Sequence, residues 1–483
     1  MTQANKTANT QDAFPKRWPA LWALSTGVLM GTLDLSIVNV ALPTLVRDLN
    51  TNFATVQWVI IIYGLIITGL MLSMGQLGDI LGQRKIFCWG MGLFTLGSLA
   101  SGISPTIHLL IAARALQAVG SVMMQALLAA IITDIFPDRE RGQALGAVGA
   151  VVSVGLALGP AAGGIIIGFA SWHFIFLINV PLGLTALFAV LHFVPDLPPV
   201  KGSRGFDIFG TGTLLASLTC YALGLTLVED LGLSDGRVLV LLGVSGVCAA
   251  GFTWAERRSS RAMLERGIVQ DPVLLMGLVM SFLVFFVVGG TYILPFYLQY
   301  GRNLSPLAVG LLMIVSPMAM GLVSPVAGAW SDRWGEGGVR LAGLFLLSAG
   351  CWAVSTLGPQ SGPWEFVVKV APIGVGLGLF QAPNTSGVMG RSSQGRSGVV
   401  SGLLSLTRNL GTTSGLPLLS AVFLAHLATG HGSLGKAAIS SASAESLAAA
   451  LSRVYQVAAL ISLAAAVFSA WAWLKIERKN QNV

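Results

Sequence analysis

An acidic residue lies in the middle of the first long apolar segment of the chain. Asp34 follows Leu33 within a run that continues to Pro43. A lone carboxylate at that depth costs several kcal/mol, so it must face a cavity, find a partner or bind a proton. Removal from water favours the protonated form, which makes Asp34 a candidate for reversible proton carriage. The alternative is a hydrogen bond that only packs two helices together.

A polar stripe occupies one face of a later apolar segment. Its members recur at i, i+3, i+7 and i+11, namely Arg114, Gln117, Ser121 and Gln125. That spacing keeps them on one side of a helix, which should point into the bundle interior rather than at lipid. Arg114 is the natural counter-charge for Asp34, as a coupling partner or as a static ion pair. We predict that Asp34 and Arg114 are the proton-coupling residues.

One polar pattern between long apolar segments occurs twice in the sequence. Gly75–Lys85 reads GQLGDILGQRK and Gly328–Gly335 reads GAWSDRWG, with Gly, Asp and Gly in the same register 253 residues apart. We call these two segments the hinge loops. Their repetition indicates two related helical halves that move against each other, as in secondary transporters. Basic loops also set membrane orientation, which is the simpler interpretation. The predicted gate residues are Gly75, Asp79, Gly82, Arg84, Lys85, Asp332 and Arg333.

A third pattern is built from small residues. Gly155–Gly164 reads GLALGPAAGG. Small side chains let two helices approach closely, and a proline in mid-span should kink its helix. We therefore predict a kinked, closely packed helix at Gly155, Gly159, Pro160, Gly163 and Gly164.

The composition places these residues in a membrane protein. Charged residues make up 10% of the 483, hydrophobic ones 54%, and the mean hydropathy is +0.77. A soluble domain has about 25% charged residues. Apolar runs of about 20 residues, each enough to cross a bilayer as a helix, recur along the chain. The polar first twenty residues and full-length first span predict no cleaved signal peptide. We place about fourteen spans near 19–43, 55–75, 84–103, 107–132, 142–166, 172–194, 206–228, 236–255, 272–295, 305–330, 339–358, 364–388, 396–425 and 454–475.

The basic residues and the repeat define the orientation and the domains. Most Lys and Arg fall in the tails and alternate loops of one side, so both termini should be cytoplasmic. The net charge of +8 then needs no nucleic-acid partner. The 253-residue offset leaves two spans between the halves. The predicted plan is a cytoplasmic tail 1–18, an N-terminal six-helix bundle 19–194, two inserted helices 206–255, a C-terminal six-helix bundle 272–475 and a cytoplasmic tail 476–483.

A substrate cavity is expected between the two halves. A second stripe of Ser405, Arg408, Asn409 and Thr412 faces it or caps a helix. The second half has no acid at mid-depth in the segments most expected to line the cavity. Amphipathic, weakly charged or monocationic compounds suit such a site best, and an anionic metabolite facing Arg114 and Arg408 remains open. The predicted cavity residues are Asp34, Gln57, Trp58, Tyr63, Gln117, Ser121, Gln125, Tyr292, Phe296, Asn384, Arg408 and Asn409.

Other classes of protein are disfavoured. The four cysteines fall inside predicted spans without metal-ligand spacing. Gly430–Ala437 resembles a phosphate-binding loop but lacks the Ser or Thr for magnesium and follows no strand. His426 and His431 do not share a helical face, so we expect no metal. The chain holds no recognisable catalytic grouping for an enzyme and no repeated rings of a channel.

With these motifs the chain resembles the major facilitator superfamily, specifically its fourteen-helix drug:proton antiporter branch. Gly75–Lys85 is similar to that superfamily's cytoplasmic gating loop, and Gly328–Gly335 to its degenerate second copy. Arg114–Gly120 resembles the proton-coupling motif, with Ala118 in place of the usual Gly. Gly155–Gly164 resembles the motif of antiporters. Leu33–Pro43 and Trp172–Pro181 resemble strings of the fourteen-helix branch, although His173 stands where Arg is usual.

The resemblance implies a fold and a mechanism. The fold is all-α, with two six-helix bundles plus two inserted helices in the cell membrane. The activity is export of amphipathic or cationic small molecules by alternating access, driven by the proton gradient, by a functional monomer without a cofactor. Asp79 and Arg84 would close the cytoplasmic side, and protonation of Asp34 would compete with substrate or with Arg114. The alternative is a metabolite facilitator or symporter of the same fold.

Overall fold

The described part of the chain is helical throughout. The computed structural model describes residues 16–197, 199, 208–232, 234–258, 271–389, 397–431 and 442–481, and these contain no strand. Thirteen helical runs are long and apolar enough to cross a membrane. The predicted all-α membrane architecture is therefore confirmed. The span predicted near 84–103 corresponds to α4 (Gln83–Gly102), which is not among the thirteen. Arg84, Lys85, three small polar residues and four glycines lower its hydropathy, so a count of fourteen stays a prediction.

The first half of the chain forms one helical bundle. In chain order its helices are α2 (Arg17–Asp48), α3 (Phe53–Leu81), α4, α5 (Ile107–Ile135), α6 (Asp138–Phe169), α7 (Phe174–Leu177) and α8 (Asn179–Phe193). Two further helices, α9 (Ile208–Leu231) and α10 (Gly236–Arg258), follow this bundle. Helix α9 packs against both α3 and α18 (Ser397–His431), while α10 packs on α9.

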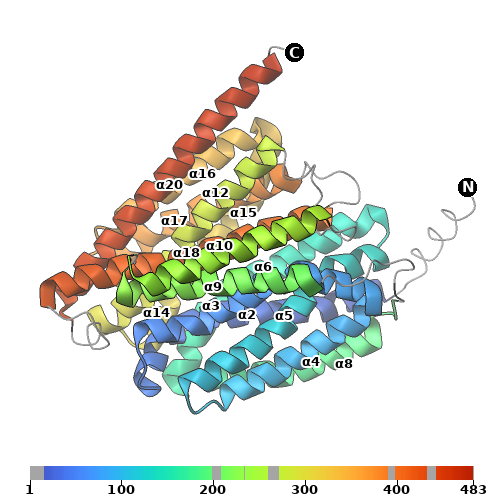
Figure 1. Cartoon of the computed structure of the whole chain (residues 1–483), viewed down its shortest axis with the longest axis horizontal. Coiled ribbons are helices and arrows are strands. Elements are labelled where there is room, and N and C mark those ends of the chain that lie inside the picture. Colours follow the sequence, from blue (N-terminus) through green and yellow to red (C-terminus); the bar gives the residue numbers. More distant parts are fainter. Residues whose placement is uncertain are drawn as a thin grey trace, which may run out of the picture.

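The second half forms another bundle, and some of its helices are interrupted. Its elements are α12 (Pro272–Gly289), η1 (Gly290–Ile293), α13 (Leu294–Phe296), η2 (Tyr297–Gly301), α14 (Pro306–Met313), α15 (Val315–Trp334), α16 (Glu336–Val354), α17 (Pro363–Met389), α18 and α20 (Ala444–Gln481). Figure 1 shows the two bundles, with α9 and α10 crossing between them in this view.

The packing repeats with the sequence. Helix α4 packs on α5 as α16 packs on α17, and α2 packs on α6 as α12 packs on α18. Each of these helices begins close to 253 residues after its counterpart. Gly82 and Gly335, which end the first helix of each hinge loop, are 253 residues apart and both have positive φ angles, 99° and 84°. A left-handed turn of that kind favours glycine, which explains why both loops keep it.

Side-chain caps fix where several helices begin. The Asn52 side chain accepts a hydrogen bond from the Thr55 amide at 2.6 Å at the start of α3. Asp271 does the same for the Val273 amide at 2.8 Å at the start of α12, where Pro272 is the first helical residue. Such caps satisfy amide groups that have no partner inside the helix.

The two bundles contact each other tightly at one end, which we call the Pro43 end. The Tyr300 hydroxyl donates to the Pro43 carbonyl at 2.9 Å, and the Gln299 side chain donates to the Val40 carbonyl at 3.2 Å. The Phe53 and Phe296 rings meet edge to face, with centroids 4.5 Å apart. These contacts close the Pro43 end between the halves.

The hinge loops lie at the opposite end, where the bundles separate. In the described part of the chain, no hydrogen bond or ion pair joins the two halves there. A side chain added at Gly75 or at Gly328 would meet no atom within 4 Å. In Figure 1 the bundles converge near α14 and diverge toward the carboxyl end of α20. The structure is therefore closed at the Pro43 end and separated at the hinge-loop end.

Candidate functional site

A buried ion pair joins α2 and α5 inside the first bundle. Asp34 and Arg114 are both fully buried, with 0% of each side chain exposed. Arg114 Nη1 donates to Asp34 Oδ2 and to Gln117 Oε1, the latter at 2.7 Å. Arg114 Nε donates to the Val59 carbonyl of α3 at 3.2 Å. The sequence prediction that Arg114 is the counter-charge of Asp34 is borne out as a contact, while the role in coupling stays a prediction.

Amide side chains complete the shell around Asp34. Gln117 Nε2 donates to Asp34 Oδ1 at 2.8 Å and lies 2.7 Å from the Ser98 hydroxyl of α4. Asn179, the first residue of α8, donates to the same carboxylate oxygen at 3.2 Å. The carboxylate thus accepts hydrogen bonds from three side chains on two other helices, α5 and α8, which is how a protein tolerates a buried charge.

Sequence reasoning missed Asn179 and Ser98 as members of this site. Asn179 lies within the Trp172–Pro181 string. Its signal was an amide inside an otherwise apolar segment, FIFLINVPLGL. Such a group needs a partner in the bundle interior, but the sequence does not say which helix supplies it.

Tyr63 connects the ion pair to the central cavity. The Arg114 guanidinium carbon lies 4.2 Å from the centroid of the Tyr63 ring and 5.6 Å from that of Phe176. Stacking on a ring face stabilises a guanidinium. Tyr63 also lines the cavity, whereas Asp34 and Arg114 do not. One tyrosine ring therefore separates the buried charges from the space where a small molecule can bind.

The central cavity lies between the two halves. Its volume is about 400 Å³, within the range of roughly 300–1,000 Å³ that small-molecule sites occupy. Helices α2, α3, α5 and α6 contribute from the first half, and α12, η1, α13, α14, α15, α17 and α18 from the second. Its wall mixes aromatic and apolar side chains with hydroxyl and amide groups. The polar stripe of α18 faces it throughout, through Ser405, Arg408, Asn409 and Thr412.

The structure places five of the twelve predicted cavity residues in this wall. They are Tyr63, Gln125, Tyr292, Arg408 and Asn409. The other seven are not in the lining formed by the described residues, so the predicted lining is corrected. Asp34, Gln117 and Ser121 belong to the buried polar core of the first bundle. Gln57 is fully buried and Trp58 packs on the apolar core. Phe296 packs on Phe53, and Asn384 donates to the Gly277 carbonyl and the Ser281 hydroxyl of α12.

The small residues of α6 form two close contacts. A Cβ on Gly159 or Gly163 would come within 3.0 Å of the Ile37 backbone on α2. A Cβ on Gly164 would lie 2.6 Å from the Pro306 carbonyl oxygen and 2.9 Å from Gly310 Cα on α14. The helix is thus held against its own bundle on one side and the opposite bundle on the other. A Gly155 side chain would collide with Thr32, again on α2.

Pro160 leaves a carbonyl without its usual helical partner, and α2 supplies one. Proline has no backbone N–H to donate to the residue four positions earlier. The Ser36 hydroxyl lies 3.3 Å from the carbonyls of both Gly155 and Leu156, where it donates. Thr32, Ser36, Leu156 and Pro160 all line the cavity, so this seam forms part of its wall.

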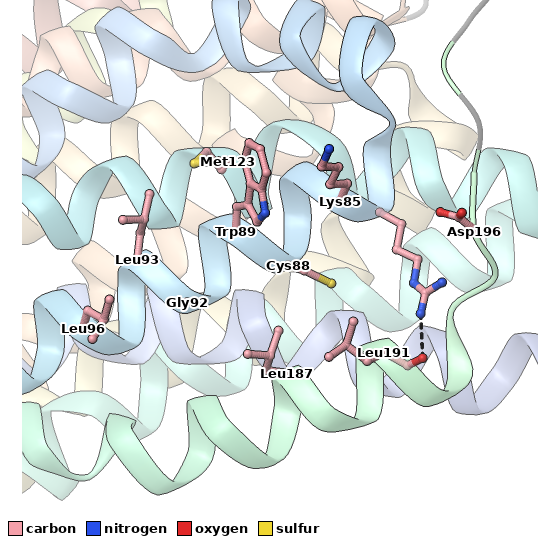
Figure 2. A pocket seen from close by; sticks show the side chains of 11 residues that line it. Lys85, Cys88, Trp89, Gly92, Leu93, Leu96, Met123, Leu187, Leu191 and Asp196 are labelled. Carbon is pink, nitrogen blue, oxygen red and sulfur yellow. Dashed lines mark hydrogen bonds between the residues drawn. The ribbon is translucent and has the colours of Figure 1, made fainter.

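The first hinge loop is anchored within its own half. Arg84 Nη2 donates to the Leu191 carbonyl of α8 at 2.6 Å, drawn as the dashed line in Figure 2. Lys85 lies 5.0 Å from the Trp89 ring centroid. Burial raises the pKa of Asp79, and a hydrogen bond with the Gln83 side chain opposes part of that rise. Among the described residues, no ion pair joins Asp79 to Arg84 in this conformation. Gly82 is the positive-φ turn described above.

The second hinge loop has fewer described contacts. Arg333 is exposed near the end of α15, and the Asp332 side chain lies outside the described part of the structure. The phosphate-loop-like segment Gly430–Ala437 also lies largely outside it, as does the N-terminal tail up to residue 15. No cluster of metal-ligating side chains occurs among the described residues.

Comparisons with known proteins agree with this architecture. The family profile of the Major Facilitator Superfamily matches residues 24–416. A riboflavin transporter of Clostridioides difficile (strain 630) is 31% identical over 84% of this chain and 88% of its own. A tetracenomycin C resistance and export protein of Streptomyces glaucescens is 30% identical over 83% and 75%. A multidrug resistance protein of Mycobacterium tuberculosis (strain CDC 1551 / Oshkosh) is 32% identical over 84% and 76%.

Solved structures share the fold at lower sequence identity. A bacterial homologue of the human lysosomal transporter Spinster, in an inward-facing and occupied conformation, superposes with a TM-score of 0.65 at 16% identity, over 95% of this chain and 97% of that one. A human organic anion transporter superposes with a TM-score of 0.61 at 17% identity, over 94% and 99%. The family match, the relatives and the helices together show that the chain belongs to the major facilitator superfamily and is a multi-pass transporter of the plasma membrane, not an enzyme.

Proposed function

We propose that the protein is a proton-coupled exporter that moves amphipathic small molecules out of the cell by alternating access. The observation that carries this proposal is the buried Asp34–Arg114 pair, one tyrosine ring away from the central cavity. Among the described residues of the membrane interior, this pair contains the acid that is best placed to exchange a proton in step with the substrate. Two of the relatives are named for drug resistance, which supports the direction of transport.

The geometry favours competition between the proton and Arg114 over direct competition between the proton and the substrate. Asp34 does not line the cavity in this conformation. Protonation of Asp34 would remove the negative charge that holds Arg114 Nη1. The guanidinium would then be bound by the Val59 carbonyl, by Gln117 and by the Tyr63 and Phe176 rings. Because Tyr63 also lines the cavity, a movement of Arg114 would reach a bound molecule through that ring.

The conformation fits one step of an alternating-access cycle. If both termini are cytoplasmic, as the distribution of Lys and Arg suggests, the Pro43 end faces outward and the structure is inward-facing. The cavity would load from the cytoplasm in this state. Opening of the Gly164–Gly310 contact and closure of the hinge loops would then release the molecule outside. The same arrangement would place fourteen helices, α4 included, across the membrane.

Proton movement in proteoliposomes tests the proposal. A pH-sensitive dye inside vesicles that hold the purified protein would report protons while cationic dyes, neutral amphiphiles and organic anions are added in turn. Substrate-dependent proton counterflow would support antiport. Substrate uptake without a proton signal would instead identify a facilitator. A riboflavin transporter among the relatives makes metabolite transport the second candidate, so riboflavin belongs in the panel.

Arg114→Ala is expected to uncouple transport and to destabilise the protein. Removing one partner of a buried ion pair leaves an uncompensated charge, which costs about 3–5 kcal/mol. Asp34 would keep its bonds to Gln117 and Asn179 but would lose its counter-charge. Substrate-driven proton flux should disappear, and the melting temperature should fall. Arg47→Ala, an exposed arginine at the end of α2, is the matched control and should change neither. Normal proton coupling in Arg114→Ala would mean that the polar stripe of α5 only supports the fold and takes no part in coupling.

A further inference from the structure

The central cavity has a single charged group in its described wall, and that group is cationic. Of the side chains that line the cavity, Arg408 is the only one that carries a charge. No acidic side chain is among the described residues that line the cavity. A small molecule in the cavity therefore experiences the field of one guanidinium, and the low-dielectric wall strengthens that field.

Arg408 has fewer partners than a guanidinium inside a membrane protein normally has. One nitrogen, Nη2, donates to the Thr385 hydroxyl of α17 at 2.6 Å. The guanidinium carbon lies 5.5 Å from the Phe285 ring centroid. Nε is buried without a hydrogen-bond partner among the described residues, and no carboxylate there forms an ion pair with this side chain. Cations in the membrane interior usually pair with an acid.

The contrast with Arg114 points to the missing partner. Arg114 is fully buried, and it too has one nitrogen, Nη2, without a hydrogen-bond partner among the described residues. Its charge is nevertheless compensated by Asp34, and Gln117, the Val59 carbonyl and the Tyr63 ring bind it further. Arg408 is half-buried and faces the cavity, and among the described residues its guanidinium has one hydrogen bond, to a neutral hydroxyl, and one ring contact. The first half of the molecule thus provides a carboxylate for its buried arginine. In the second half, no described carboxylate pairs with Arg408, and its guanidinium faces the cavity where a substrate would bind.

The surroundings of Arg408 define the chemistry that would fill this place. A guanidinium binds carboxylate, sulfonate and phosphate oxygens through paired N–H groups. Gln381 and Asn409 line the same wall and supply amide hydrogen-bond donors. Phe285, Tyr292 and Tyr63 provide aromatic faces for a planar ring system. The matching ligand has an oxyanion at one end and an aromatic body at the other.

We propose that Arg408 forms an anion-binding subsite of the central cavity, so that the preferred cargo is a planar aromatic amphiphile carrying an oxyanion. This proposal narrows the substrate class of the exporter and rests on the cavity being its transport site. It departs from the sequence-based preference for weakly charged or monocationic compounds and takes up the anionic alternative that the sequence left open, because a cation would be repelled by the one charge that the described wall presents.

Binding of two probes with the same ring system tests the subsite. The purified full chain in nanodiscs would be titrated with 1-anilinonaphthalene-8-sulfonate and with its uncharged parent, N-phenyl-1-naphthylamine, with empty nanodiscs as background. The wild type should bind the sulfonate about tenfold or more tightly than the parent. Arg408→Gln keeps a hydrogen-bonding side chain but removes the charge, and should lose that preference. Arg408→Lys should retain most of it, and Arg453→Gln, an exposed arginine of the same half, all of it.

The outcomes separate this proposal from the proposed function. No gradient is present, so the binding result does not depend on proton coupling through Asp34. Selective loss of the sulfonate in Arg408→Gln supports the subsite. Equal binding of both probes by the wild type, or a parallel loss of both in Arg408→Gln with Arg408→Lys unchanged, overturns it. In proteoliposomes, exchange of an anion for a proton moves net positive charge inward, so an inside-negative potential should accelerate export of the sulfonate. A rate of sulfonate export that does not change with the membrane potential would contradict exchange of an anion for a proton.

Discussion

Asp34→Asn is expected to reduce proton-driven transport to the rate of protein-free vesicles while leaving the protein folded in the membrane. Asparagine has nearly the shape of aspartate but neither binds nor releases a proton at physiological pH. Arg114 would lose its counter-charge yet keep its hydrogen bonds to Gln117 and to the Val59 carbonyl. It would also keep the Tyr63 ring face. The variant should therefore be less stable but still assembled.

The comparison needs a control on the same helix. Asp48→Asn removes an acid that pairs with the neighbouring Arg47 at the surface end of α2, and it should transport normally. Substrate-dependent proton counterflow and gradient-driven substrate flux would be measured in matched proteoliposomes. Size-exclusion profiles and insertion yields would report folding. If Asp34→Asn retained full gradient-driven flux, proton carriage by Asp34 would be wrong and the pair would be a packing element.

The ion pair was predictable from sequence because the membrane leaves few options. An acid and a base buried among apolar residues have almost no other partner, so the sequence alone predicts that Asp34 pairs with Arg114. The repeat was predictable for a similar reason, since the positive-φ turns at Gly82 and Gly335 need glycine. The polar stripe of α18 was recognised by its spacing, and all four members face the cavity.

Aromatic and amide residues were harder to place. Phe296 and Tyr292 are four residues apart in an interrupted helix, yet one packs on Phe53 and the other lines the cavity. Both are aromatic, and only the rotation of each segment against its neighbours decides which side it faces. Asn384 is a polar residue within a membrane span, as a substrate contact would be, but its side chain forms hydrogen bonds from α17 to α12 instead. These choices depend on tertiary packing, which no local pattern records.

Gly164→Ala is expected to open the Pro43 end and to abolish transport by preventing the present conformation from forming. A Cβ at this position would lie 2.6 Å from the Pro306 carbonyl oxygen and 2.9 Å from Gly310 Cα. Both are backbone atoms of α14, so no side-chain rotation relieves the clash. The bundles would have to separate there by a few tenths of an ångström or more. Because packed interfaces switch between discrete arrangements rather than deform continuously, the balance should move to the state that is open at the Pro43 end.

Spin labels on a cysteine-free background would measure this shift. Labels at Arg47, near the end of α2, and at Gln360, between α16 and α17, both lie at the Pro43 end and should move apart in Gly164→Ala. Labels at Leu81 and Trp334, within the hinge loops, should approach each other. Gly168→Ala is the matched control, because its Cβ would meet Leu307 at an ordinary 3.4 Å. Gly310→Ala should reproduce the shift from the other side, since its Cβ would lie 2.8 Å from Gly164 Cα. The double variant should add little, because both changes break one contact. Lost transport with unchanged label distances would make this seam a packing element and would locate the switch between the halves elsewhere.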